Sequence, residues 1–369
     1  MTESYDGLRA EVRHALDVLV TSGREAGVQV AAYLHGERIV EEQAGVADSA
    51  TGRPMTADTP GYAVSTGKGL TTTVVHVLAE RGELDYDLRV ADVWPEFARH
   101  GKDRITLRHA LTHTAGLPAL PPDVTVDDFA DWDRMCAIVA DSAPLWAPGE
   151  RLAYHAWTFG WIVGETVRRV TGRRVGEVLA TDVAAPLGVT GELFLGVPEA
   201  DQARLARMED GNLSAMLAAV AGQLPHLDRV APPGARPDGG LAARPHVLAV
   251  DVPAVGTLTA RAAARMYAAL IGEVDGVRLI SPHRLRAVAG VAVRGPEWVF
   301  GQEAAWGLGY AVDDDGSFGA AGSGGSLAFA YPRLGLAVAA TRNRLAVGDG
   351  DPLQRLRVLI RDAVAARVG

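Results

Sequence analysis

Strand-like patterns lie at both ends of this chain of 369 residues, and helix-like patterns fill the stretch between them. Apolar runs at 28–34 and 38–44 flank the turn His35-Gly36-Glu37, which predicts a hairpin. Residues 305–343 alternate like three strands joined by turns. One sheet built from both ends would leave the middle of the chain as an inserted lobe, with a site in the cleft between the two lobes.

The predicted organisation has two lobes. We expect a sheet lobe formed by residues 1–64 and 246–369 and a mainly helical lobe formed by residues 65–245. The segment Pro232–Pro245 is too rich in proline and glycine for a regular element and is the best linker candidate. Helical patterns predict helices at 5–20, at 65–81 before Gly82, at 157–172, at 259–276 and at 351–368.

Charge and hydropathy exclude several classes of partner. The formal net charge of −9 argues against a nucleic-acid binder, because a phosphate backbone requires clustered positive charge. No stretch approaches the roughly 20 apolar residues of a membrane span. The N-terminus opens with acidic and polar residues, where a secretory signal places positive charge and then an apolar run. We therefore expect a cytoplasmic protein without nucleic-acid or membrane partners.

Metal and thiol chemistry have little support in the sequence. Cys136 is the only cysteine, so an internal disulfide and a cysteine metal cluster are both excluded, and a small buried side chain is expected there. His109 and His113 are four residues apart, but the zinc-protease pattern H-E-x-x-H fails because Ala110 follows His109. We expect a structural role for both histidines, and neither a metal nor an organic cofactor.

The stretch Ala63–Thr73, AVSTGKGLTTT, allows two interpretations. A phosphate-binding loop fails at both ends, because Tyr62 replaces its first glycine and Gly69 its final hydroxyl residue. The alternative is the S-x-x-K motif of Ser65 and Lys68. Residues three apart on a helix share a face, and burial near a helix N-terminus favours a neutral amine. The motif therefore predicts a serine nucleophile beside its own base.

Further segments run in the order of a known family. They are STGK at 65–68, GELDYDLRVADVWPEF at 82–97, ITLRHALTHTAGLP at 105–118, WAPGERLAYHAWTFGWIVGETVRRVTG at 146–172, APLGV at 185–189, and GLGY and GAAGSGGSLAFAYP between 307 and 332. On these residues the chain resembles the serine β-lactamase and penicillin-binding-protein superfamily, in the branch of class C β-lactamases, related esterases and acyltransferases.

The resemblance implies a fold and a catalytic set. The implied fold is α/β and β-lactamase-like, with an antiparallel sheet flanked by helices, an inserted helical lobe and the active site between them. The second family motif implies a catalytic Tyr154, although Ala156 stands at its asparagine position. The third motif, Lys or His, then Ser or Thr, then Gly, aligns with Ala320-Ala321-Gly322. The backbone amides of Ser65 and Ser323 would form the oxyanion hole.

The pocket walls are predicted from position along the chain. We expect His155, Trp157 and Trp306 to contribute to substrate binding, together with Ala320, Ala321 and Gly322. The two alanines offer neither the charge nor the hydroxyl with which the family binds a substrate carboxylate.

These observations favour a serine enzyme that forms an acyl-enzyme from a small ester or amide. The acyl group would pass to an amine or alcohol, as in a biosynthetic transacylase, or to water, as in an esterase. The partners would be a small-molecule acyl donor and acceptor. A β-lactamase or D-alanyl carboxypeptidase is the alternative within the family, and an inactive small-ligand-binding module is the alternative from another class.

Overall fold

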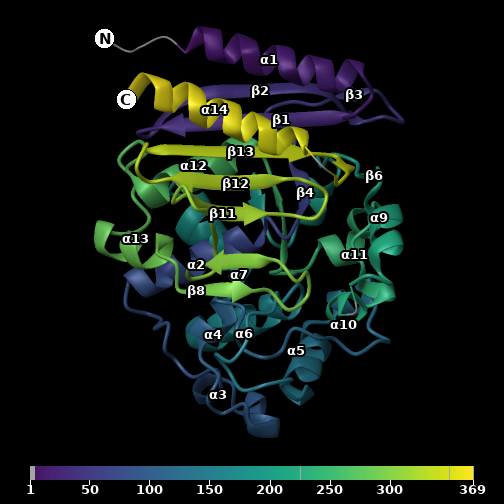
Figure 1. Cartoon of the computed structure of the whole chain (residues 1–369), viewed down its shortest axis with the longest axis vertical. Helices are drawn as coiled ribbons and strands as arrows, with labels where there is room; N and C mark the ends of the chain where they lie inside the picture. The colour runs from purple at the N-terminus through teal and green to yellow at the C-terminus, as the bar shows by residue number, and fades with distance from the viewer. Residues whose placement is uncertain (1–4, 225, 349, 369) are drawn as a thin grey trace.

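A computed structural model describes residues 5–224, 226–348 and 350–368. Its main sheet has nine strands in the order β3-β2-β1-β13-β12-β11-β10-β9-β8, with antiparallel pairing throughout (Figure 1). The strands are β1 (Gly27–Leu34), β2 (Glu37–Asp48), β3 (Arg53–Pro54), β8 (Val293–Pro296), β9 (Glu303–Trp306), β10 (Ala311–Val312), β11 (Phe318–Ala321), β12 (Leu327–Tyr331) and β13 (Leu336–Arg342).

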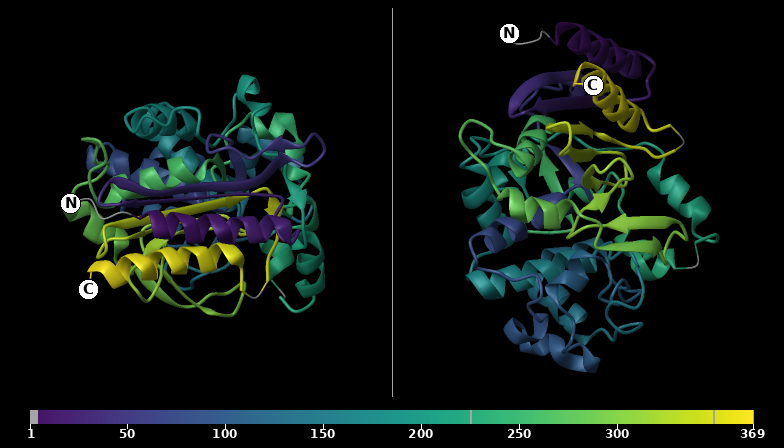
Figure 2. Two further views of the ribbon diagram at one scale, coloured as in Figure 1. Left: turned by 90° about the horizontal axis from the view of Figure 1, so that it is seen from above. Right: turned by 60° about the vertical axis from the view of Figure 1, so that its left-hand side comes forward.

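The two ends of the chain meet at the centre of this sheet. Strand β1 pairs with β13 from Val28 opposite Arg342 to Leu34 opposite Leu336. All eight residues of β1 are buried, because helices cover both faces of the sheet. Helices α1 (Asp6–Thr21) and α14 (Pro352–Val368) lie on one face, and α12 (Ala260–Ile271) packs on the other (Figures 1 and 2).

The middle of the chain is mainly helical and forms the lower part of the molecule in Figure 1. Among the described residues, its longest helices are α2 (Lys68–Glu80), α5 (Trp132–Asp141) and α6 (Thr158–Thr171). The shorter ones are α3 (Val90–Val93), α4 (Leu107–Leu111), α7 (Val175–Val178), α8 (Glu199–Gln202), α9 (Leu213–Val220), α10 (Leu227–Val230) and α11 (Pro245–Leu248), and α13 (Pro282–Ala289) follows α12.

Two small sheets connect the lobes. Strand β7 (Val255–Leu258) lies between β4 (Gly61–Val64) and β5 (Leu193–Phe194). Strand β6 (Glu209–Asp210) pairs in parallel with β14 (Arg344–Leu345). The first of these sheets matters for function, because β4 runs directly into the S-x-x-K segment.

The predicted architecture, an antiparallel sheet flanked by helices, is confirmed. The hairpin and the first and last helices are present at the expected positions. Residues 305–343, expected as three strands, contain the end of β9 and strands β10 to β13. The helix expected at 259–276 ends at Ile271, and Val274 and Val277 form a β-bridge beyond it. Two further expectations need correction. The helix expected from Ser65 begins at Lys68, because Ser65 has a φ of 62°. Segment 232–245 is no open linker, since it contains short helical turns at 233–235 and 241–243 and ends at α11.

The lobe limits stay a prediction, although the strands of the main sheet come from residues 27–54 and 293–342. In the part of the chain that the structure describes, no helix is both long and apolar enough to cross a bilayer.

Candidate active site

Ser65 is at the tip of a tight turn between β4 and α2. Its φ of 62° lies in the left-handed region, which costs free energy for a residue other than glycine. The N–H of Thr66 donates to the carbonyl of Val64 at 2.8 Å and closes a three-residue turn around the serine. The Thr66 hydroxyl donates to the carbonyl of Ser326 at 2.9 Å. This turn therefore fixes Ser65 against the end of the main sheet.

Two glycines allow the backbone to approach this turn. A Cβ on Gly67 would lie 2.0 Å from the carbonyl carbon of Val255 in β7. A Cβ on Gly322 would lie 1.5 Å from the carbonyl oxygen of Val64. Both distances are far inside van der Waals contact, so only glycine lets β7 and the end of β11 lie against the serine turn.

Lys68 is the first residue of α2 and lies beside the serine. Its Nζ donates to Ser65 Oγ at 3.1 Å and to the carbonyl of Ala254 at 3.2 Å. The side chain is buried, and burial lowers the pKa of its amine to about 7. A substantial fraction of Lys68 is therefore neutral near physiological pH and able to accept a proton.

Tyr154 faces the same serine from the segment before α6. Lys68 Nζ lies 4.9 Å from the centroid of its ring. Burial raises the pKa of the Tyr154 hydroxyl to about 12, although a hydrogen bond with Ser65 acts in the opposite direction. The hydroxyl is thus protonated where the lysine amine is partly neutral, so this pair contains both a proton acceptor and a proton donor.

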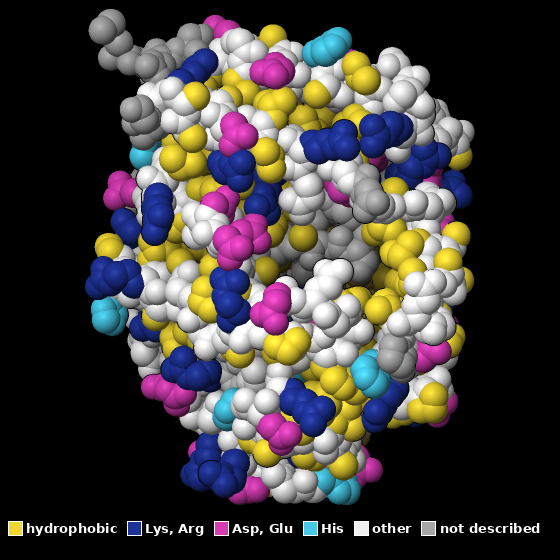
Figure 3. All heavy atoms as spheres, in the orientation of Figure 1, with side chains coloured by type: hydrophobic (Ala, Val, Ile, Leu, Met, Phe, Trp, Pro, Cys, Tyr) yellow, Lys and Arg dark blue, Asp and Glu magenta, His cyan; other side chains and the backbone are white. Residues whose placement is uncertain are grey.

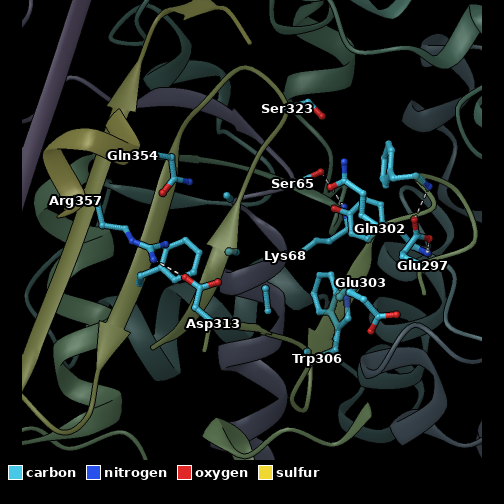
Figure 4. Close-up of a pocket in the computed structure, with 18 residues that line it drawn as sticks. Ser65, Lys68, Glu297, Gln302, Glu303, Trp306, Asp313, Ser323, Gln354 and Arg357 are labelled. Atoms are coloured by element: carbon cyan, nitrogen blue, oxygen red, sulfur yellow. Dashed lines mark hydrogen bonds and ion pairs between the residues drawn. The ribbon is translucent and has the colours of Figure 1, made fainter. Parts of the chain in front are cut away.

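The three side chains open into a cavity of about 510 Å³ (Figure 4). Figure 3 shows a hollow on the corresponding face of the molecule, where acidic and basic side chains are interspersed. The lining residues are Ser65, Lys68, Tyr154, Glu297, Phe300, Gln302, Glu303, Ala304, Trp306, Gly309, Ala311, Asp313, Ala320, Ala321, Ser323, Phe329, Gln354 and Arg357. Its lining combines apolar side chains such as Phe300, Trp306 and Phe329 with polar ones, and α14 contributes Gln354 and Arg357.

The third-motif strand borders this cavity. Ala320 and Ala321 pair with Ala328 and Leu327 of β12, whereas the short β10 reaches only Phe318 and Gly319. The end of β11 is therefore not covered by β10, and Ala320, Ala321 and Ser323 line the cavity with Ser65. This placement suits the predicted oxyanion hole, which stays a prediction.

Trp306 lines the cavity, and its expected role in substrate binding stays a prediction. It lies 5.8 Å from the Tyr154 ring, in a stacked arrangement with an interplanar angle of 27°. The predicted substrate-binding residues His155, Trp157 and Gly322 do not line the cavity, which corrects the prediction for all three. His155 is fully buried, accepts from the N–H of Leu117 at 3.1 Å and contacts the carbonyl of Ala153 at 2.6 Å. Trp157 is buried against Phe129, with ring centroids 4.6 Å apart.

Two further histidines, His109 and His113, and the single cysteine have structural roles, as the following contacts indicate. The His109 ring accepts a hydrogen bond from the N–H of Thr106 at the start of α4, and His113 Nδ1 accepts from the N–H of His155 at 3.1 Å. Cys136 is buried, as predicted. Within the described ranges, no group of three or more His, Cys, Asp or Glu side chains could hold a metal ion.

Sequence reasoning missed the residues that the β8–β9 loop and α14 contribute. Glu297 and Phe300 come from that loop, and Gln354 and Arg357 come from α14 (Figure 4). Arg357 forms an ion pair with Asp313 across the cavity wall. Their local sequence carries no catalytic pattern, and only the pairing of β9 through β13 brings them near Ser65.

Comparisons with known proteins agree with this geometry. The family model Beta-lactamase matches residues 12–362. Esterase/beta-lactamase LipL of Mycobacterium tuberculosis is 35% identical over 87% of this chain and 78% of its own length. The crystal structure of a family VIII carboxylesterase has a TM-score of 0.84 and 32% identity, over 96% of this chain and 97% of that one.

The chain belongs to the β-lactamase family. It is a serine hydrolase-type enzyme, like the esterases and β-lactamases of this family. A partial match, monacolin J acid methylbutanoyltransferase of Aspergillus terreus, is 29% identical over 38% of this chain and 39% of its own length. The last comparison covers too little of either chain to establish acyl transfer.

Proposed function

We propose that this enzyme forms an acyl-enzyme at Ser65 from a small, uncharged ester and passes the acyl group to an alcohol or amine, or to water. The observation that carries the proposal is the contact of 3.1 Å between Ser65 and a lysine whose amine has a pKa of about 7, inside a cavity large enough for a small ester. A neutral base in direct contact with a serine hydroxyl is what nucleophilic catalysis by serine requires.

The proposed acylation uses two proton carriers. Neutral Lys68 accepts the proton of Ser65 as Oγ attacks the ester carbonyl carbon, and the backbone amides of Ser65 and Ser323 stabilise the resulting oxyanion. The Tyr154 hydroxyl donates its proton to the leaving alkoxide as the carbon–oxygen bond breaks. Lys68, now an ammonium group, then returns a proton to Tyr154. An acceptor alcohol, amine or water attacks the acyl-enzyme by the same route in reverse.

Transfer to an acceptor is favoured over simple hydrolysis by two features. The side chains that bind a substrate carboxylate in the family are replaced by Ala320 and Ala321, which is unexpected in an enzyme of antibiotic defence or wall cutting. The cavity continues past these alanines to Gln354 and Arg357, leaving room for an acceptor beside the bound acyl group. Three further statements remain predictions: a biosynthetic role, a cytoplasmic location, and partners that are small molecules only.

The test is a partition experiment. The enzyme is supplied with a p-nitrophenyl ester, total turnover is followed by nitrophenol release, and free acid and transfer product are separated by chromatography as acceptor alcohols and amines are varied. Ser65→Ala supplies the background of uncatalysed transfer. The proposal predicts that at least one acceptor lowers the acid yield in proportion to the product formed. An acid yield that no acceptor changes would identify a plain esterase.

A further inference from the structure

The segment that carries Tyr154 is irregular and is held by residues distant in sequence. Residues 153–155 belong to no helix or strand, yet each of their N–H groups has a partner. Ala153 N–H donates to the carbonyl of His113 at 3.0 Å, and His155 N–H donates to His113 Nδ1 at 3.1 Å. Tyr154 N–H donates to Glu297 Oε1 at 2.6 Å. The position of Tyr154 therefore depends on His113 and Glu297.

Glu297 ties Tyr154 to the loop after β8. The residue is only 4% exposed and borders the cavity that contains Ser65. While Oε1 accepts from Tyr154, Oε2 accepts from the N–H groups of Val299 at 3.0 Å and Phe300 at 2.7 Å. Hydrogen bonds to an ionised carboxylate are roughly twice as strong as neutral ones. One side chain thus fixes both Tyr154 and the cavity wall residue Phe300.

The loop that presents Glu297 is itself anchored on the helical lobe. The N–H of Trp298 donates to the carbonyl of Leu152 at 2.9 Å, beside the Glu297–Tyr154 contact. The Trp298 ring stacks on His226 at 3.7 Å with an interplanar angle of 8°, and its centroid lies 5.1 Å from that of Trp146. These contacts place the carboxylate at a defined position next to the tyrosine.

The charge of Glu297 also acts on the tyrosine. Lys68 and His113 are the other ionisable groups that approach the ring, at 4.9 Å each. His113 is uncharged, because burial holds the pKa of its imidazole well below the ordinary value. Burial is the main cause that raises the pKa of the Tyr154 hydroxyl, and the negative charge of Glu297 acts in the same direction. Glu297 therefore favours the protonated tyrosine.

We propose that Glu297 is a positioning residue for acylation: its carboxylate holds Tyr154 and Phe300 in place beside Ser65. The inference rests on the proposed function, because it assumes that Tyr154 donates a proton to the leaving group.

The test compares three variants with the wild-type enzyme. Glu297→Gln removes the charge and one acceptor, and Glu297→Asp keeps the charge on a shorter side chain. The matched control is Asp251→Asn, because Asp251 is also a buried carboxylate that accepts from a backbone N–H, that of Gly176 at 2.7 Å, but it does not border the cavity. The measurements are melting temperature, pre-steady-state acylation by a p-nitrophenyl ester, and kcat and KM from pH 6 to 10.5.

The expected result is that Glu297→Gln slows acylation by about 10- to 100-fold, mainly through kcat, as for a misplaced proton donor. The wild-type rate should stay level up to pH 10.5, because the pKa of its Tyr154 hydroxyl is about 12, and a decline below pH 10.5 should appear only in Glu297→Gln, whose tyrosine loses its proton more easily. Glu297→Asp should recover the wild-type profile at high pH and part of the rate. Asp251→Asn should change stability without changing either quantity.

Two outcomes overturn the inference. In the first, Glu297→Gln is acylated within twofold of the wild-type rate and has the same pH profile. In the second, its acylation rate falls no further than that of Asp251→Asn when the two variants are equally stable. Failure of the proposed function is a different result, because the wild-type enzyme itself would then form no acyl-enzyme.

Discussion

Lys68 and Lys102 are the only lysines of the chain, and both are buried. The Nζ of Lys102 donates to the carbonyls of Ala140 and Ser142, which can only accept and so hold an ammonium group in place. Lys68 contacts one carbonyl and the hydroxyl of Ser65, which can itself give up a proton. The neighbouring atoms, and not burial alone, make Lys68 the candidate base.

Replacing Lys68 by arginine tests this role. Arg keeps a positive charge but stays protonated at any working pH, so it cannot accept the serine proton. General-base catalysis contributes typically 10²- to 10⁴-fold, and we expect Lys68→Arg to lose about that much in kcat/KM for an aryl ester, nearly as much as Lys68→Ala. The wild-type rate should decline as the pH is lowered below about 7, because Lys68 becomes protonated there. A near wild-type rate in Lys68→Arg would mean that Lys68 acts through its positive charge and does not accept the serine proton.

Family motifs were sufficient to bring Ser65, Lys68 and Tyr154 together. The helical spacing assumed for Ser65 and Lys68 does not apply, because Ser65 lies in the turn before α2 and meets Lys68 through that turn. Sequence reasoning failed for His155 and Trp157. Adjacency to Tyr154 suggested a place in the pocket, but burial and the hydrogen bond from Leu117 turn the His155 ring into the core. Glu297 could not be found from sequence, since its role depends on contacts with backbone atoms 143 residues away.

In the proposed mechanism, catalysis depends on how closely β11 approaches the turn between β4 and α2. The hairpin and the long amphipathic helices were predictable because their patterns are local. Strand β4 has four residues, and its partner β7 lies almost 200 residues along the chain, so its pairing left no local signal. The short β8 was also missed, and with it the loop that shapes one side of the cavity.

Gly322→Ala tests the close approach. The new Cβ would collide with the carbonyl oxygen of Val64 and force the end of β11 away from Ser65. Loss of one oxyanion donor typically costs about 10²- to 10³-fold in kcat, and we expect a loss of that order. Gly295→Ala in β8 is the control, because a Cβ there meets nothing within 4 Å. Steady-state kinetics and melting temperatures of both variants provide the check. If Gly322→Ala were as active as Gly295→Ala, catalysis would not require β11 to contact the turn.

At the scale of the whole molecule, the cavity forms where distant parts of the chain meet. The helical middle provides Ser65, Lys68 and Tyr154, the C-terminal strands provide Trp306 and the third-motif backbone, and the last helix provides Arg357. The guanidinium of Arg357 is paired with Asp313 and lies 3.9 Å from the centroid of the Phe329 ring. Of the described cationic side chains that line the cavity, Arg357 is already paired with Asp313 and Lys68 contacts Ser65.

This charge distribution predicts poor β-lactam hydrolysis. Each missing charge-assisted hydrogen bond is worth about 1.5 to 3 kcal/mol, or roughly 10- to 100-fold in binding. We expect kcat/KM for a chromogenic cephalosporin to be at least 100-fold below that for a p-nitrophenyl ester of a short acid. Ala321→Thr, which restores a hydroxyl to the strand, should narrow the gap. Efficient cephalosporin turnover by the unmodified enzyme would contradict the account of substrate selection.

The proposed function requires a covalent intermediate on Ser65. To detect it, the enzyme is mixed with an activated ester and quenched in acid, and the masses of the intact protein and of its peptides are measured. We expect one added acyl mass on the peptide that contains Ser65, formed within the first turnover and absent from Ser65→Ala, whose turnover should fall by about three orders of magnitude or more. Ester turnover without any adduct in the wild type, or an undiminished rate in Ser65→Ala, would contradict the proposed function.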